Sequence, residues 1–299
     1  MRSVMTAAIV SMLMVAIWND SNSAIAQARQ AQSASKQIDI RKKAESGDAQ
    51  AQYELAEHLW GRENLADRTE AVQWYGKAAE QGYALAQSVL GFFFQVAQEY
   101  AEAAQWYRKA AEQGNLNAQC ALALLYENGQ GVPQDFAEAA QWYRKAAEQG
   151  NAGAQVALAM LYEDGKGVPN DYVKAGQWLR KAADQRDANA QCGIGLLFRD
   201  GKGVPQDFAE AARWFKKAAE QGHGAAQLGL ASQYENGKGV PLDYVLAYRW
   251  YNEAAAQAVP TADRKRDSLS SRMTREQIAE AQRLSRDFVP SKREERPPC

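Results

Sequence analysis

Metal ligation is the first chemistry that the residue types suggest, but the spacing argues against it. Glu54 and His58 are four residues apart and would share one helix face, yet they do not form the HExxH motif of a zinc site. The other histidine, His223, is distant in the sequence, so a His-based zinc site is not expected. We interpret Glu54 and His58 as the polar outer face of a terminal repeat, and we predict no metal and no cofactor.

Three lysines lie in the sequence GKGVP, which is reminiscent of a phosphate-binding loop. They are Lys166, Lys202 and Lys238. The Walker motif requires a further glycine upstream and a Ser or Thr directly after Gly-Lys, and both are missing here. We predict a solvated row of lysines along one edge of the protein, within turns, with contact to an anionic partner as the alternative.

These lysines belong to an internal repeat that governs most of the chain. Ala-Gln pairs and Gly-x-Gly-Val-Pro loops recur in register with a series of tryptophans, and such periodicity indicates a repeat architecture. We define six repeats, at residues 48–82, 83–114, 115–150, 151–186, 187–222 and 223–258. We predict that one tryptophan in each repeat is a structural anchor: Trp74, Trp106, Trp142, Trp178, Trp214 and Trp250. From Trp106 onward, successive tryptophans in this series are 36 residues apart.

Each repeat reads as two helices. In the third, Ala118, Leu122 and Leu125 mark one apolar face of the first helix. Gly129 and Gly131 end that helix, and Pro133 excludes helix from the residue before it. The second helix begins at an aspartate N-cap that is followed three residues later by glutamate, a capping-box pattern. The pairs are Asp135 and Glu138, Asp207 and Glu210, and Asp67 and Glu70.

Such helix pairs cannot bury both faces alone, so they must stack on their neighbours. Alanines allow the helices to approach closely, and the tryptophan fills the space between repeats. The pattern resembles the Sel1-like repeat family, a tetratricopeptide-like branch of the α-solenoids, most clearly in AQCALALLYENGQGVPQDFAEAAQWYRKAAEQG at 118–150 and its three successors. The resemblance implies an all-α, right-handed solenoid that binds proteins or peptides on a curved inner surface, often in exported bacterial proteins.

Departures from the repeat are candidates for function. The second repeat lacks the Gly-x-Gly-Val-Pro loop and instead carries Phe92, Phe93 and Phe94. Three consecutive residues cannot share one helix face, so these rings either seal the shortened turn or provide an aromatic anchor for a partner. Cys120 and Cys192 hold equivalent positions two repeats apart, too far for a disulfide. We predict two buried thiols and an exposed Cys299.

The two ends of the chain differ from the repeats. Residues 1–26 have the features of a secretory signal peptide: Arg2, an apolar stretch and the triplet Ala24-Ile25-Ala26. An uncleaved membrane anchor is the alternative. Residues 27–47 form a lead-in. Residues 259–289 are predicted to form capping helices, with a Thr274–Gln277 capping pattern, and 290–299 to form a disordered tail.

The 299 residues carry a net charge of −1, which argues against nucleic-acid binding. From the signal-like segment and the resemblance to the repeat family, we expect a periplasmic or secreted scaffold that binds a protein or peptide in the groove lined by the first helices. We expect no stable membrane insertion after signal cleavage. Glycan binding by an aromatic strip is one alternative. The other is a hydrolase like the cysteine-rich relatives of the family, but the paired cysteines of those relatives are missing here, and no nucleophile–base pair stands out from the repeated background.

Overall fold

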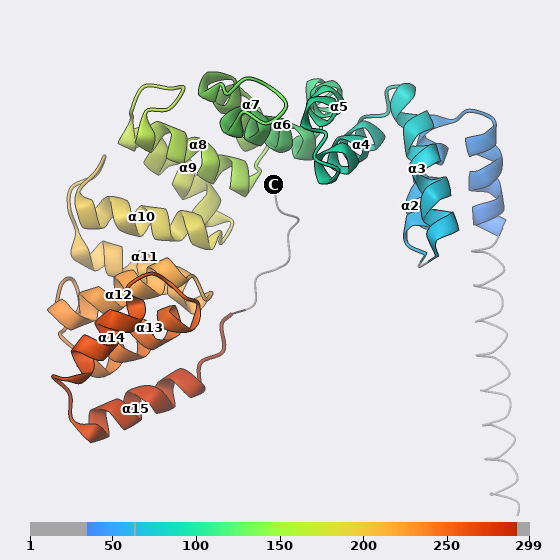
Figure 1. Cartoon of the computed structure of the whole chain (residues 1–299). Coiled ribbons are helices and arrows are strands. Elements are labelled where there is room, and N and C mark those ends of the chain that lie inside the picture. The colour runs from blue at the N-terminus through green and yellow to red at the C-terminus, as the bar shows by residue number, and fades with distance from the viewer. Residues whose placement is uncertain (1–34, 63, 292–299) are drawn as a thin grey trace, which may run out of the picture. The chain divides into compact units, whose positions relative to one another are not determined.

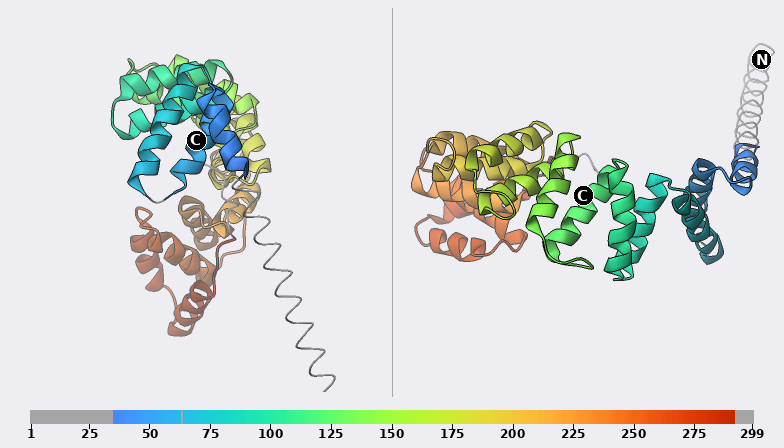
Figure 2. Two further views of the ribbon diagram at one scale, coloured as in Figure 1. Left: turned by 90° about the vertical axis from the view of Figure 1, so that its right-hand side faces the viewer. Right: turned by 90° about the horizontal axis from the view of Figure 1, so that it is seen from above.

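The computed structural model describes residues 35–62 and 64–291. The predicted signal peptide and Cys299 lie outside these residues. Within them every regular element is an α-helix, which confirms the all-α prediction (Figures 1 and 2). The chain forms two compact units that divide between Ala97 and Gln98, inside the short second repeat.

The first unit contains a helix over residues 35–45, within the predicted lead-in, and three further helices, of which α2 packs on α3 and α3 on α4. Their bounds are Ala49–Trp60 (α2), Leu65–Glu80 (α3) and Ala84–Val96 (α4). The prediction that Asp67 caps α3 is wrong: Asn64 is the N-cap, and its Oδ1 accepts from the Asp67 backbone N–H at 2.8 Å. No Gly-x-Gly-Val-Pro loop precedes α3, so the helix can extend toward its N-terminus.

The second unit is a stack of helix pairs in chain order. Each first helix packs on the second helix of its own repeat and on the second helix of the preceding repeat. The bounds are Tyr100–Glu112 (α5), Leu116–Asn128 (α6), Phe136–Glu148 (α7), Ala152–Asp164 (α8), Tyr172–Asp184 (α9), Ala188–Asp200 (α10), Phe208–Glu220 (α11), Gly224–Asn236 (α12), Tyr244–Ala256 (α13), Ala262–Ser270 (α14) and Arg275–Arg286 (α15).

Local signals set the helix ends within the third repeat. The Asp135 side chain accepts from the backbone N–H groups of Ala137 and Glu138 at 2.8 and 3.0 Å, so it caps α7. Gly129 ends α6 in the left-handed conformation, as a C-terminal glycine readily does. Both ends follow the sequence prediction.

The second glycine of each loop touches the preceding repeat. Gly167 lies against the start of α7, where an added Cβ would be 2.2 Å from the Phe136 carbonyl carbon. No side chain fits there, so glycine is required for the close approach as well as for its positive φ of 68°. The equivalent glycines meet the same obstacle at the preceding second helix: Gly131, Gly203 and Gly239.

A ladder of paired glutamines, one of each pair buried, joins successive repeats. Gln119 donates from Nε2 to the Ala111 carbonyl at the end of the preceding second helix at 3.2 Å, and accepts from Gln149 Nε2 at 2.7 Å. The ladder thus satisfies carbonyls that a helix C-terminus leaves without an intrahelical partner. Equivalent pairs along the second unit are Gln155 with Gln185, Gln191 with Gln221, and Gln227 with Gln257.

The core between the helices consists mainly of alanine with larger side chains at intervals. Trp74, Trp142, Trp214 and Trp250 are buried, whereas Trp106 and Trp178 are half-buried. In five repeats a lysine three residues further along the helix covers the indole, with its Nζ about 4 Å from the ring centroid: Lys77, Lys109, Lys145, Lys181 and Lys217. The indole therefore fills space between helices and also supports a charged surface group.

Cys120 and Cys192, the two cysteines in the described part of the chain, are buried and form no disulfide, as predicted. Burial raises the pKa of the Cys192 thiol to about 11. Because the thiolate is the reactive form, this thiol is chemically inert at neutral pH.

Helices α14 and α15 both pack on α13 at the end of the repeats. Thr274 and Gln277 form a reciprocal capping box at the start of α15. Phe288 meets the Trp250 ring edge-on at 5.4 Å between centroids. Ser291, in the predicted tail, donates from its backbone N–H to the Glu220 carbonyl at 2.9 Å, so it satisfies the C-terminus of α11.

Candidate functional site

The three GKGVP lysines each lie over an aromatic ring of the preceding repeat. Lys166 Nζ is 5.7 Å from the Phe136 ring centroid and 2.8 Å from Asp164 Oδ2. The distance from Nζ to the ring centroid is 5.1 Å for Lys202 over Tyr172 and 5.3 Å for Lys238 over Phe208. These lysines therefore help to hold each loop on the preceding repeat, close to the glycine contact.

The three phenylalanines of the second repeat differ in exposure, and all lie in the first unit. Phe93 packs with Trp60 and Tyr75, at 4.9 and 5.8 Å between ring centroids. Phe94 is half-buried, and Phe92 is 54% exposed. Phe93 therefore has a packing role, whereas Phe92 presents an aromatic ring to solvent.

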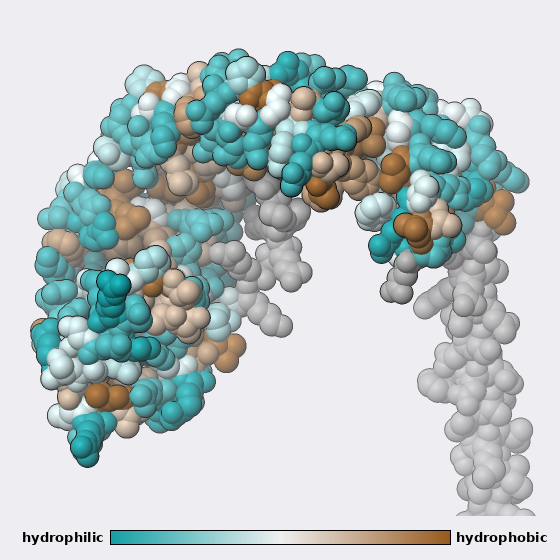
Figure 3. All heavy atoms as spheres, in the orientation of Figure 1, coloured by the Kyte–Doolittle hydropathy of each residue, from teal (hydrophilic) through white to brown (hydrophobic). Residues whose placement is uncertain are grey.

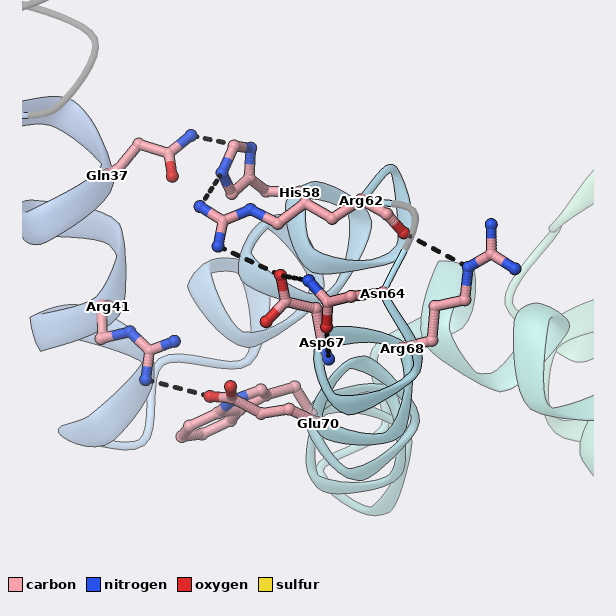
Figure 4. Close-up of polar contacts among 9 residues, drawn as sticks. Gln37, Arg41, His58, Arg62, Asn64, Asp67, Arg68 and Glu70 are labelled. Atoms are coloured by element: carbon pink, nitrogen blue, oxygen red, sulfur yellow. Dashed lines mark hydrogen bonds and ion pairs between the residues drawn. The ribbon is translucent and has the colours of Figure 1, made fainter.

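His58 belongs to a network of polar side chains (Figure 4). Its Nδ1 lies 2.7 Å from Gln37 Nε2, and its Nε2 accepts from Arg62 at 3.1 Å. Burial and the nearby Arg62 charge lower the pKa of His58. Glu54 instead accepts from Gln50, and the described residues contain no group of three His, Cys, Asp or Glu suited to a metal.

A row of exposed apolar side chains runs along the first helices of the second unit. Leu124 on α6, Met160 on α8 and Leu196 on α10 occupy equivalent positions and are 37%, 59% and 38% exposed. Ala121, Ala157 and Gly193 precede them by three residues and are half-buried. We call Leu124, Met160 and Leu196 the apolar row. The sequence contains a signal for this row that our prediction did not use: apolar residues recur at a repeat position that lies outside the core pattern.

A separate apolar pocket of about 480 Å³ lies between α9 and α10. Its walls include Ile194 and Leu197, which are buried, and Val173, which is 55% exposed. Arg180 and Lys181 also line it, and none of its lining residues is acidic. The volume is typical of a site for a small molecule or for side chains of a bound chain. The space-filling view shows apolar patches within a mainly hydrophilic surface (Figure 3).

These features define a helical-repeat scaffold with apolar contact surfaces. Six consecutive Sel1 repeats match at residues 49–83, 84–115, 116–151, 152–187, 188–223 and 224–259, and the chain belongs to the Sel1 repeat family. Sel1 repeats mediate protein interactions, and the fold is generally a non-catalytic scaffold.

Two solved structures support this assignment. The first is a protective antigen of uropathogenic Escherichia coli strains with an SLR fold, at 35% identity and a TM-score of 0.75. The alignment covers 84% of this chain but 56% of the antigen, so the chain spans little more than half of that relative. The second is a Sel1 repeat protein from Oxalobacter formigenes, at 36% identity and a TM-score of 0.58, covering 64% of this chain and 83% of that one. No curated protein matches the chain.

Proposed function

We propose that the protein is an exported scaffold of the bacterial envelope that binds a protein or peptide segment along the first helices of its repeats. The observation that carries the proposal is the apolar row, because Leu124, Met160 and Leu196 recur at one repeat position without entering the core. A preformed helical surface can bind an extended partner with little ordering of its own, which reduces the entropic cost of association.

A periplasmic or secreted location is part of the proposal. It rests on the signal-like residues 1–26 and on the E. coli relative, which is described as a protective antigen. Within residues 35–62 and 64–291, none of the helices has the length and apolarity needed to cross a bilayer.

Site-specific photocrosslinking tests the interaction surface. A photoreactive amino acid replaces Met160, and in a control variant it replaces Gln141, which is exposed on the second helix α7. In the native host, we expect a discrete protein adduct from position 160 that disappears when Leu196→Glu is added. Equal adducts from both positions, or none from position 160, would count against the proposal.

An activity assay separates the scaffold from the hydrolase alternative. Purified protein is incubated with nitrocefin and with isolated cell wall. We expect no turnover, because the side chains of the apolar row, Leu124, Met160 and Leu196, carry neither a nucleophile nor a general base. Hydrolysis that persists through stringent purification and scales with protein concentration would favour the hydrolase.

A further inference from the structure

The pocket between α9 and α10 forms where the fourth repeat departs from its neighbours. Gly176 takes the helix position that Ala140 and Ala212 hold in the adjacent repeats, and both alanines are buried. A Cβ at Gly176 would approach Leu197 Cδ1 to 3.3 Å, so its absence leaves space in the wall. Val173 replaces the alanine found at this position in three other repeats, Ala101, Ala137 and Ala209. One change enlarges the pocket and the other adds apolar surface to its rim.

Both charged residues that line the pocket are cations. Arg180 and Lys181 line it and are both exposed. Their contacts are with rings: the Arg180 guanidinium lies 4.8 Å from the Trp214 ring centroid, and Lys181 Nζ lies 4.0 Å from that of Trp178. Lys202 lies above the lining residue Tyr172 but interacts electrostatically with the carboxylates of Glu163 and Asp200.

Two carboxylates close in sequence to the lining residues already have cationic partners. Asp171 caps α9 through the Lys174 backbone and pairs with Lys174 Nζ at 3.2 Å. Asp200 pairs with Arg199 at 2.6 Å. Within the described part of the chain, neither Arg180 nor Lys181 has an ion pair with a carboxylate. Arg180 and Lys181 are therefore available to an acidic partner.

We infer that this pocket binds an acidic peptide segment, with an aromatic or branched apolar side chain in the pocket and an adjacent Asp or Glu at Arg180 and Lys181. The inference rests on the proposed function, because it names the partner chemistry of the same scaffold. The apolar wall supplies burial of the side chain, and the cations supply charge complementarity, which governs specificity and the rate of association.

Selection from random peptides tests the inference without knowledge of the natural partner. Phage-displayed 12-residue peptides are selected on the purified, immobilised protein. We expect enriched sequences to place Phe, Tyr, Trp, Leu or Ile next to Asp or Glu. The affinity of a fluorescein-labelled synthetic copy, measured by fluorescence polarisation, should fall as salt is raised, because the contacts with the cations are screened.

Substitutions then locate the site. Val173→Glu and Arg180→Glu change exposed side chains, so both variants should keep the helical circular dichroism of the wild type. We expect each to weaken binding of the selected peptide about tenfold or more by introducing a negative charge at the pocket. The matched control is Ala137→Glu, which makes a similar change at the position of Val173 one repeat earlier and should leave the affinity unchanged.

The alternative outcomes distinguish the two proposals. Selection of basic peptides would overturn the pocket inference and leave the scaffold proposal standing. The same conclusion would follow if the affinity of the selected peptides were unchanged by Val173→Glu but reduced by Met160→Glu. If no peptide is enriched above the support alone, both proposals of peptide binding fail.

Discussion

Replacing Gly167 by alanine should destabilise the protein much more than the same replacement at a turn glycine that touches nothing. Gly167 has a φ of 68°, so alanine there incurs the left-handed backbone cost of about 1–2 kcal/mol. Its Cβ would also lie 2.2 Å from the Phe136 carbonyl carbon and oxygen, where ordinary contact begins near 3.4 Å. The loop must therefore retreat from α7, and such overpacking costs a further 1–3 kcal/mol, roughly.

Two neighbouring glycines separate these contributions. Gly150 has a φ of 94° and nothing within 4 Å of an added Cβ, so Gly150→Ala measures the backbone cost alone. Gly165 has a φ of 67° and a nearest contact of 3.3 Å, to the Asn170 side chain, so Gly165→Ala should be intermediate. We expect total losses of about 2–5 kcal/mol for Gly167→Ala and about 1–2 kcal/mol for Gly150→Ala.

Urea unfolding followed by circular dichroism gives the midpoints of the three variants. Because repeat arrays can lose two-state cooperativity, native-state hydrogen exchange should accompany it and should show increased exchange at the loop and at the start of α7 in Gly167→Ala. If Gly167→Ala and Gly150→Ala unfold at the same urea concentration, the claim that the loop glycine is required for docking on the preceding repeat is refuted.

Three other measurements follow from the structure and sequence. Gln155→Leu removes the hydrogen bonds to the Ala147 carbonyl and to Gln185, at 3.0 and 3.1 Å, and should lower the unfolding free energy by about 1–3 kcal/mol. The control Gln141→Leu, at an exposed position, should change the unfolding free energy little. Equal urea midpoints for the two variants would contradict a stabilising role of the glutamine ladder. In the folded protein burial raises the pKa of Cys192 from 9.0 to about 11 and that of Tyr53 from 10.0 to about 12. The stability that these two protonated groups contribute should therefore be complete below pH 9 and fall as pH rises toward 12. Coinciding thermal melting curves at pH 8 and pH 11 would disprove this. Alkaline phosphatase fused after residue 26 should be active in a bacterial host, and an inactive but stable fusion would argue against export.

The buried tyrosines act in the same direction as Cys192 at alkaline pH. Burial is the largest cause of the raised pKa values of Tyr75, Tyr107 and Tyr251. In the unfolded chain these phenols would lose their protons at lower pH than in the folded protein. The resulting loss of stability with rising pH should therefore be shared between both units.

The repeats and most helix ends could be predicted from the sequence because they depend on neighbouring residues. Asp135, Gly129 and Pro133 each act within a few positions of the helix end that they define. The early start of α3 at Leu65 was missed because the absence of a loop, rather than a cap at Asp67, decides it. The tryptophan spacing, the Ala-Gln pairs and the Gly-x-Gly-Val-Pro loops, which recur in register, together indicated the repeat.

The tertiary structure alone decided what the repeated residues do for one another. Ala-Gln pairs were visible as a spacing, but the role of Gln119 requires the Ala111 carbonyl and Gln149 from different helices. The second loop glycine and the pocket at Gly176 likewise depend on how one repeat meets the next. Local sequence determines where a helix begins and ends. A contact between repeats forms only when two segments that are distant in the sequence reach their final separation. A single missing Cβ then determines whether these segments touch or leave a pocket.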